Sequence, residues 1–244
     1  LFSGATRPGD HVVFANPSFP TYRKVAEFYW LDITAVPLTA AGAADVDAML
    51  AAITPATRLV CVPSPNNPTG EMLTAEEITR LASLMPSDVM LHFDEAYYEF
   101  SRASGGPVTL PLLEACAGPW LATRSFSKAF GLAGARLGYG IASDAETAAR
   151  WRAMRPNFSV TMLAQVAGLA ALDARLEAET TIFRITSERA KLAAELEKIG
   201  LTPLPSAGNF LAIPAASLGE NPVAALADRG ILVGSFESRG IPYL

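Results

Sequence analysis

The fold is decided by the stretch Arg58-Leu59-Val60-Cys61-Val62-Pro63, a continuous apolar run that predicts a strand buried on both faces of a sheet. Further apolar runs predict strands over residues 11–15, 33–37, 89–93, 120–123 and 137–142. Helices are expected at 21–29, at 45–53 and from Thr74, where Glu77 three residues later gives a capping box. Apolar strands separated by amphipathic helices are typical of a mostly parallel sheet covered on both faces. The sequence therefore predicts an α/β fold.

The pattern changes after residue 154. A helix is expected at 146–154 with Ser143 as its cap, followed by an apolar helix at 160–172 and a long, charged helix at 175–199. The long helix, on the order of 35 Å at 1.5 Å per residue, has the reach to bridge two domains. Beyond it, strands at 209–213 and 231–233 and a helix from Asn221 predict the start of a smaller α+β domain. We expect a large domain in residues 1–154, interdomain helices in 155–199 and part of a small domain in 200–244.

The two ends of the sequence indicate a piece of a longer protein. The chain begins at Leu1 rather than at a methionine, and it stops at Leu244 in mid-pattern without a polar tail. We therefore interpret it as a fragment.

Composition narrows the class of partner. A formal net charge of −5 gives no general attraction to nucleic acid or to anionic lipid, and no apolar run reaches the length of a membrane span. Cys61 and Cys116 lie in or beside apolar runs, so we interpret them as buried free thiols of a reducing compartment. The sequence thus predicts a cytoplasmic protein without a nucleic-acid or membrane partner.

Residues whose side chains suit binding or catalysis follow four of the predicted strands. They are Phe19 after the strand 11–15, Asn67 after 58–63, Asp94 and Tyr97 after 89–93, and Ser125 and Lys128 after 120–123. Ligands of open α/β sheets bind at the carboxyl ends of the strands. We therefore expect an aromatic ring, an amide, a carboxylate with a phenol, and an amine to meet at one edge of the sheet.

The stretch from Ser125 to Gly138 places Lys128 beside the hydroxyls of Ser125 and Ser127, with Arg136 eight residues further on. Hydroxyls and a guanidinium fork suit phosphate oxygens. A neighbouring cation such as Arg136 also favours the neutral, nucleophilic form of a lysine. Taken alone, the stretch fits an ordinary surface turn equally well.

The other residues have structural alternatives too. Asn67 fits the start of a turn that Pro68 and Gly70 demand. The remaining alternatives are a strand-end cap for Asp94, core packing for Phe19, a turn hydroxyl for Ser127 and a surface position for Arg136. Only the combination of motifs, each after its own strand, favours a site.

This combination resembles a known family. Asn67-Pro68-Thr69-Gly70, Asp94-Glu95-Ala96-Tyr97 and Ser125-Phe126-Ser127-Lys128 with Arg136, in this order, look like the fold-type I pyridoxal-phosphate aminotransferases of classes I and II. Within that family they most resemble the histidinol-phosphate aminotransferase branch. The resemblance covers nearly the whole chain and implies pyridoxal 5′-phosphate as the cofactor.

The resemblance also implies a role for each residue. Lys128 would bind the cofactor covalently, Asp94 would pair with its pyridine nitrogen, and Asn67 and Tyr97 would hold its phenolic oxygen. Arg136, Ser125 and Ser127 would face its phosphate, while Phe19 would stack on its ring. Lys128, Asp94 and Tyr97 are then the expected catalytic residues.

The implied reaction moves an amino group between an amino acid, or an amine derived from one, and a 2-oxo acid. Two alternatives remain open: a decarboxylase or lyase of the same fold, similar to threonine-phosphate decarboxylase, and a non-catalytic binding domain. Members of the family are usually homodimers, so a homodimer is expected. Histidinol-phosphate aminotransferases usually carry an arginine where this chain has Gly234, which weakens the case for a phosphorylated substrate unless Arg239 replaces it.

The two histidines have different expected roles. His11 begins a strand and is interpreted as structural. His92 lies two residues before Asp94, so strand alternation points both side chains to one face. We hypothesise that His92 supports Asp94 through a hydrogen bond. No metal-ligand spacing, Ser-His-Asp arrangement or nucleotide-type phosphate loop is recognisable.

Overall fold

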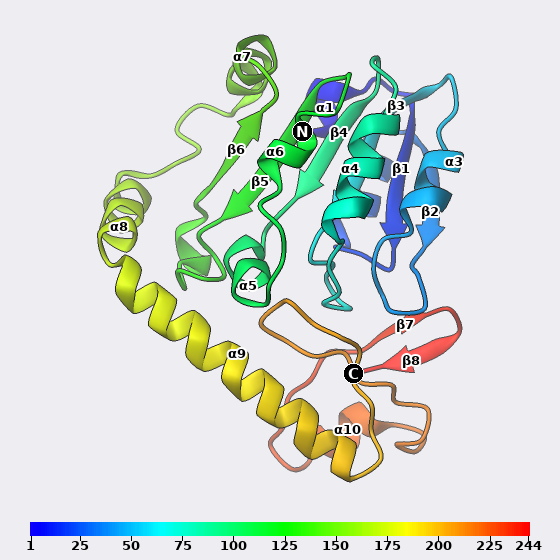
Figure 1. Cartoon of the computed structure of the whole chain (residues 1–244), viewed down its shortest axis with the longest axis vertical. Coiled ribbons are helices and arrows are strands. Elements are labelled where there is room, and N and C mark those ends of the chain that lie inside the picture. The colour runs from blue at the N-terminus through cyan, green and yellow to red at the C-terminus, as the bar shows by residue number, and fades with distance from the viewer.

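The computed structural model describes residues 1–244, and its centre is a six-stranded sheet (Figure 1). The strand order is β2-β1-β3-β4-β5-β6, and all neighbours are parallel except β6, which runs antiparallel to β5. The strands are β1 (His11–Asn16), β2 (Asp32–Pro37), β3 (Thr57–Pro63), β4 (Met90–Asp94), β5 (Trp120–Ser125) and β6 (Gly138–Ala142). The predicted mostly parallel α/β fold is thus confirmed.

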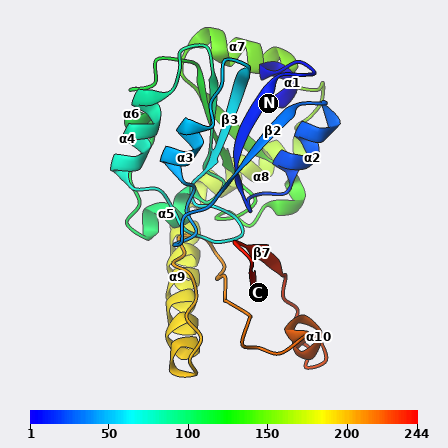
Figure 2. The ribbon, with the colours of Figure 1, turned by 90° about the vertical axis from the view of Figure 1, so that its right-hand side faces the viewer.

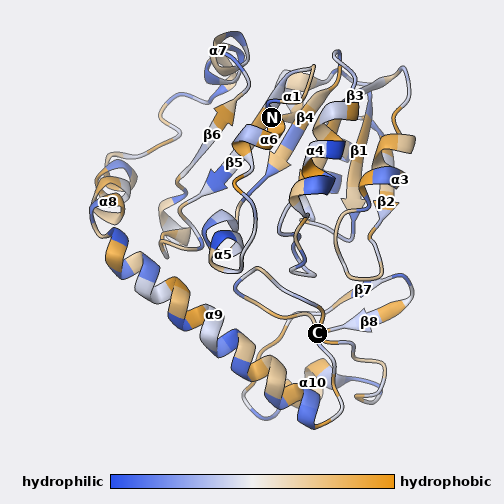
Figure 3. Cartoon of the chain, in the orientation of Figure 1, coloured by the Kyte–Doolittle hydropathy of each residue, from blue (hydrophilic) through white to orange (hydrophobic).

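Helices cover both faces of this sheet (Figure 2). One core cluster packs β-strand residues such as Val60 and Phe93 against α3 (Val46–Ala51), α4 (Ala75–Leu84) and α6 (Leu110–Leu113). A second cluster packs Phe14 and Cys61 against α1 (Phe2–Ala5), α2 (Thr21–Phe28) and α7 (Ala145–Met154). Strands buried on both sides explain the continuous apolar runs of the sequence, and Figure 3 shows β1 and β4 mostly in hydrophobic colours.

A long helix links this sheet to the C-terminal segment. After α5 (Tyr98–Ala103), the short η1 (Ala133–Ala135) and α8 (Met162–Asp173), helix α9 (Arg175–Lys198) runs away from the sheet. It reaches a segment containing α10 (Pro222–Ala227) and the hairpin β7 (Phe236–Ser238) and β8 (Ile241–Tyr243). Figure 1 shows this segment facing the carboxyl ends of the parallel strands. The division into domains at residues 154 and 199 stays a prediction.

The predicted strands at 209–213 and 231–233 do not form. A strand needs a neighbour for its backbone groups, and Ile231 instead donates its amide to the Leu226 carbonyl at the end of α10. In the 209–213 segment only the last residue, Ile213, pairs in this way: it exchanges backbone hydrogen bonds with Leu244, beside an isolated bridge between Pro214 and Tyr243. The C-terminal sheet is the hairpin β7-β8, whose two turn residues, Arg239 and Gly240, have φ values of 54° and 76°. Positive φ at both positions is the geometry of a tight two-residue hairpin turn.

The caps of the helices mostly agree with the sequence. Thr74 and Glu77 form the predicted capping box at the start of α4. The cap of α7 is Asp144 rather than Ser143, because the Asp144 carboxylate accepts the Thr147 amide at 2.7 Å while the Ser143 hydroxyl donates to Asp144. Thr161 caps α8 in the same way, so that this helix begins at Met162 rather than at residue 160.

Candidate functional site

The carboxyl ends of β1, β3, β4 and β5 meet at one cavity of about 360 Å³. Its lining includes all eight residues that the sequence predicts for the site. They are Phe19, Asn67, Asp94, Tyr97, Ser125, Ser127, Lys128 and Arg136. Side chains up to 117 positions apart in sequence are therefore gathered at one edge of the sheet, as parallel strands predict.

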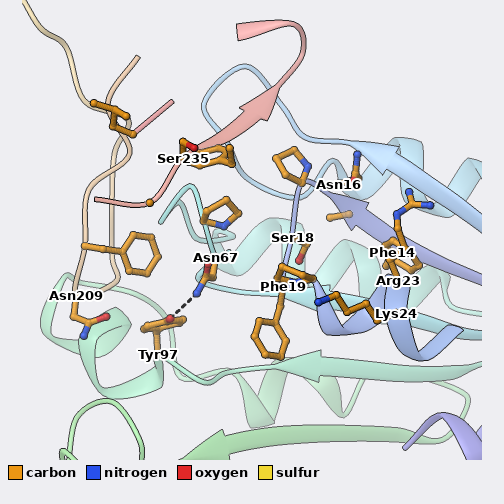
Figure 4. Close-up of a pocket in the computed structure, with 18 of the residues that line it drawn as sticks. Phe14, Asn16, Ser18, Phe19, Arg23, Lys24, Asn67, Tyr97, Asn209 and Ser235 are labelled. Carbon is orange, nitrogen blue, oxygen red and sulfur yellow. Dashed lines mark hydrogen bonds between the residues drawn. The ribbon is translucent and has the colours of Figure 1, made fainter. Parts of the chain in front are cut away.

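A buried phenol forms one wall of the cavity. The Asn67 Nδ2 group donates to the Tyr97 hydroxyl at 2.8 Å. Figure 4 shows the Asn67 amide pointing at the Tyr97 phenol, with Phe19 on the opposite side of Asn67. The Lys128 Nζ atom lies 5.2 Å from the centroid of the Tyr97 ring. The Phe210 ring meets the same phenol edge-to-face at 5.3 Å. Tyr97 is thus fixed from both sides, by the loop after β3 and by the C-terminal segment.

The Asp94 carboxylate is held by two donors. Its Oδ1 atom accepts the Ala96 amide at 3.1 Å, and its Oδ2 atom accepts the Tyr22 hydroxyl from helix α2. Burial, and next the negative charge of Asp94, raise the pKa of Tyr22 well above its usual value. Tyr22 therefore keeps its proton and acts as the donor.

The hypothesis that His92 hydrogen-bonds Asp94 is wrong. The His92 Nε2 atom instead pairs with the Thr123 hydroxyl of β5 at 2.9 Å, because β5 lies directly beside β4 in the sheet. Burial lowers the pKa of His92, which favours the neutral ring. His11 lies at the start of β1 and pairs with Thr34 and Thr57, a structural role as expected.

Cationic and hydroxyl groups gather on the Lys128 side of the cavity. The Ser125 hydroxyl accepts the Ser127 amide at 3.0 Å and keeps its own proton for donation. Arg136 follows η1 with φ of 54°, and one of its NH groups bonds the Ala133 carbonyl at 2.7 Å. Its other donors and the Lys128 amine remain for an anion.

A second cavity of about 870 Å³ adjoins the first and shares Phe19, Asn67, Tyr97 and Lys128 with it. The C-terminal segment contributes Phe210, Gly234, Ser235 and Phe236 to its lining, and α2 contributes Arg23 and Lys24. Arg239 is absent from this lining and donates to the Leu38 carbonyl at 3.1 Å. Arg239 therefore does not take the place of the arginine that the resemblance leads one to expect at position 234, where this chain has glycine.

The sequence reasoning missed Tyr22, Arg23 and Lys24. Helical periodicity predicts that Tyr22 is buried together with Ala26 four residues later, but nothing in the sequence pairs it with a carboxylate 72 positions away.

Both cysteines are free, Cys61 buried and Cys116 half-buried. No group of three or more acidic, histidine or cysteine side chains is placed to hold a metal ion, and no helix has both the length and the apolar content to cross a bilayer.

The fold and the cavity define an α/β protein that places a lysine, a carboxylate and a group of donors suited to phosphate at the carboxyl ends of its parallel strands. The chain belongs to the aminotransferase class I and II family, whose sequence profile matches residues 1–242. It is 38% identical over 235 residues to histidinol-phosphate aminotransferase of Geobacillus thermodenitrificans, covering 96% of this chain and 64% of that protein. It is 36% identical to aromatic amino acid aminotransferase of Rhodococcus jostii, covering 99% and 66% of the two chains.

Solved structures agree with this family. Histidinol-phosphate aminotransferase from Sinorhizobium meliloti in complex with pyridoxal-5′-phosphate superposes with a TM-score of 0.86 and 27% identity, over 98% of this chain and 66% of that one. An aminotransferase from Mycobacterium tuberculosis gives a TM-score of 0.83 and 27% identity, over 99% and 67%. The chain spans 61 to 66% of the length of the first curated relatives it matches.

Proposed function

We propose that the protein is a pyridoxal-phosphate-dependent aminotransferase. It would move an amino group between an amino acid, or an amine derived from one, and a 2-oxo acid. The observation that carries this proposal is the meeting of Lys128, Asp94, Tyr97 and Asn67 in one cavity. An amine, a carboxylate and a phenol–amide pair are the groups that a pyridine aldehyde with a phenolic oxygen requires.

The residues present fit this cofactor. Asp94 offers a negative charge to a ring nitrogen, and Tyr97 and Asn67 offer polar groups, 2.8 Å from each other, to a ring oxygen. The remaining donors of Arg136, Ser125 and Ser127 suit phosphate oxygens. Phe19, 47% exposed, presents an aromatic face that a second ring would cover.

When bound, the cofactor supplies a ring that withdraws electrons from the substrate Cα. The residues of the chain do the rest. Asp94 would hold the ring nitrogen in its protonated state, and Tyr97 with Asn67 would orient the ring. The Lys128 amine would act as the general base that takes the proton from the substrate Cα and holds it at Nζ for return.

The substrate would lie in the second, larger cavity. We propose an enzyme similar to histidinol-phosphate aminotransferase, with aromatic amino acids as the second candidate. The second candidate is favoured by one observation: Phe19, Phe210 and Phe236 line this cavity, while Gly234 brings no charge and Arg239 lies outside. Comparing histidinol phosphate with phenylalanine and tyrosine as amino donors would separate the two.

Several further points rest on the family resemblance alone. We propose that the protein is a homodimer in the cytoplasm, and that residues 1–154 and 200–244 belong to a large and a small domain. A decarboxylase of the same fold would release carbon dioxide instead of a keto product. A non-catalytic binding domain would give neither product.

The first test is Lys128→Ala in the full-length protein. We expect no absorbance from lysine-bound cofactor and a loss of transamination of at least about a thousand-fold, since the base is removed. Lys24→Ala is the matched control, because Lys24 lines only the second cavity and should leave that absorbance in place. Normal turnover by Lys128→Ala would overturn the proposed function.

A further inference from the structure

Tyr22 lines the candidate site next to Asp94. It lies in the first turn of α2 and is 4% exposed. Its hydroxyl donates to Oδ2 of Asp94. The only other hydrogen bond to this carboxylate comes from the backbone of Ala96, so Tyr22 is its one side-chain donor.

The ring of Tyr22 holds a second residue of the site. It packs edge-to-face on Phe19 with the centroids 6.0 Å apart and the planes at 84°. Phe19 and Asp94 come from different elements, the loop after β1 and the end of β4. One side chain therefore sets both the aromatic wall and the carboxylate of the cavity.

The surroundings of Tyr22 lock it in place. The His92 ring packs edge-to-face on it with the centroids 6.0 Å apart, while its Nε2 atom pairs with the Thr123 hydroxyl. Phe14 of β1 packs on the ring at 6.3 Å. A side chain fixed this way keeps its hydroxyl aimed at Asp94.

We propose that Tyr22 is a positioning residue that fixes the Asp94 carboxylate against the ring nitrogen of the cofactor and sets the Phe19 ring across the ring face. This inference rests on the proposed function. A donor to the charged carboxylate favours the arrangement in which the proton stays on the ring nitrogen and the negative charge stays on Asp94. Without that donor, the proton is shared back toward Asp94 and the ring nitrogen becomes more neutral.

Tyr22→Phe in the full-length protein tests the hydroxyl, because the ring and its packing are kept. We expect the affinity for pyridoxal phosphate to fall by about 10- to 100-fold, the size of one charge-assisted hydrogen bond. With ¹⁵N-labelled cofactor, the nitrogen resonance should move toward the value of neutral pyridine. Tyr29→Phe, at the other end of α2, is the matched control and should change neither quantity.

Tyr22→Leu then tests the ring. We expect it to lower the affinity further than Tyr22→Phe and to weaken the circular dichroism induced in the cofactor, because Phe19 loses its support. Unchanged affinity and an unchanged ¹⁵N resonance in a folded Tyr22→Phe protein would overturn the inference. A wild-type protein that binds no pyridoxal phosphate would instead overturn the proposed function.

If neither variant folds, the wild-type protein carries the test. The buried hydroxyl proton of Tyr22 should give a slowly exchanging, low-field ¹H resonance that shifts when pyridoxal phosphate binds next to Asp94. A resonance that stays in place on binding would overturn the inference.

Discussion

A buried ion pair ties together the two strand ends that carry the site. The Arg124 Nε atom lies 3.0 Å from Oε2 of Glu95, and the two side chains are 10% and 1% exposed. The Thr109 hydroxyl donates to the other oxygen of Glu95. The Arg124 guanidinium also lies over the Tyr98 ring, 3.3 Å from its centroid. Because Glu95 follows Asp94 and Arg124 precedes Ser125, the pair connects the ends of β4 and β5.

Arg124→Met removes the cation and leaves a buried carboxylate with the Thr109 hydroxyl alone. Breaking a buried pair in this way costs about 3–5 kcal/mol of unfolding free energy. For a chain of this size, that corresponds to a fall in Tm of roughly 6–20 °C. The double variant Arg124→Met with Glu95→Gln removes the charge as well, and we expect it to recover most of the loss.

The loss of unfolding free energy in Arg124→Met should depend on pH. Burial raises the pKa of Glu95 above its usual value, although the Thr109 hydroxyl and then Arg124 oppose the rise. Without Arg124 the pKa in the folded state rises further. The folded protein then binds a proton more readily than the unfolded chain, so stability falls as pH rises from the unfolded value through the folded value. Arg124→Met should therefore be more damaging at pH 8 than at pH 5.

Urea unfolding of the wild type and the two variants at both pH values measures this. The reasoning would be refuted if Arg124→Met lost the same free energy at pH 5 and pH 8 and Glu95→Gln gave no recovery. Such a result would assign the loss to the stacking on Tyr98 rather than to an unpaired charge. Arg124→Lys separates these contributions, because it keeps a cation but loses the planar stack.

Two further predictions concern backbone positions. Trp30 is 77% exposed and has a φ of 50°. Trp30→Gly should therefore raise the unfolding free energy by about 1 kcal/mol, because the cost of a left-handed conformation for a non-glycine residue exceeds the conformational entropy that glycine loses on folding. Thermal melting measures this, and a gain in Trp30→Ala as large as in Trp30→Gly would contradict it. Gly70 has a φ of 91° and a Cβ there would lie 2.3 Å from the Ser206 hydroxyl. Gly70→Ala should therefore cost about 2–4 kcal/mol in urea unfolding, with partial recovery in the double variant with Ser206→Gly; full stability of Gly70→Ala would refute the clash.

The sheet could be predicted from the sequence because burial on both faces leaves a direct trace. The run 58–63 is apolar at nearly every position, and it forms β3, which begins one residue earlier at Thr57 and ends at Pro63 as predicted. The position of the site could be predicted equally well, since Asp94 ends a strand, Asn67 and Lys128 follow strands, and parallel strands end at a common edge. Here a local pattern decides a long-range arrangement.

The C-terminal segment could not be predicted in the same way. Ile231 and Leu232 are apolar, but they are 51% and 87% exposed and have no strand beside them. Whether an apolar run becomes a strand depends on a neighbour with free backbone groups, which the run itself does not encode. The hairpin β7-β8 depends instead on the turn at Arg239 and Gly240, whose positive φ values are explicit only in the structure.

The two halves of the site have different origins in the fold, and this has a consequence for how substrate choice changes. The groups for the cofactor come from strand ends fixed by the core of the sheet. The second cavity is completed by the C-terminal segment, which reaches the sheet through a few contacts, including the Ala207 amide on the Gly70 carbonyl at 2.7 Å and Phe210 on Tyr97. Substitutions at Asn209, Leu211 or 234–236 are therefore expected to alter the proposed substrate cavity while the sheet-borne groups stay in place. A change at Gly70 or Phe210 instead disturbs both halves, because these two contacts transmit the position of the C-terminal segment to Asn67 and Tyr97.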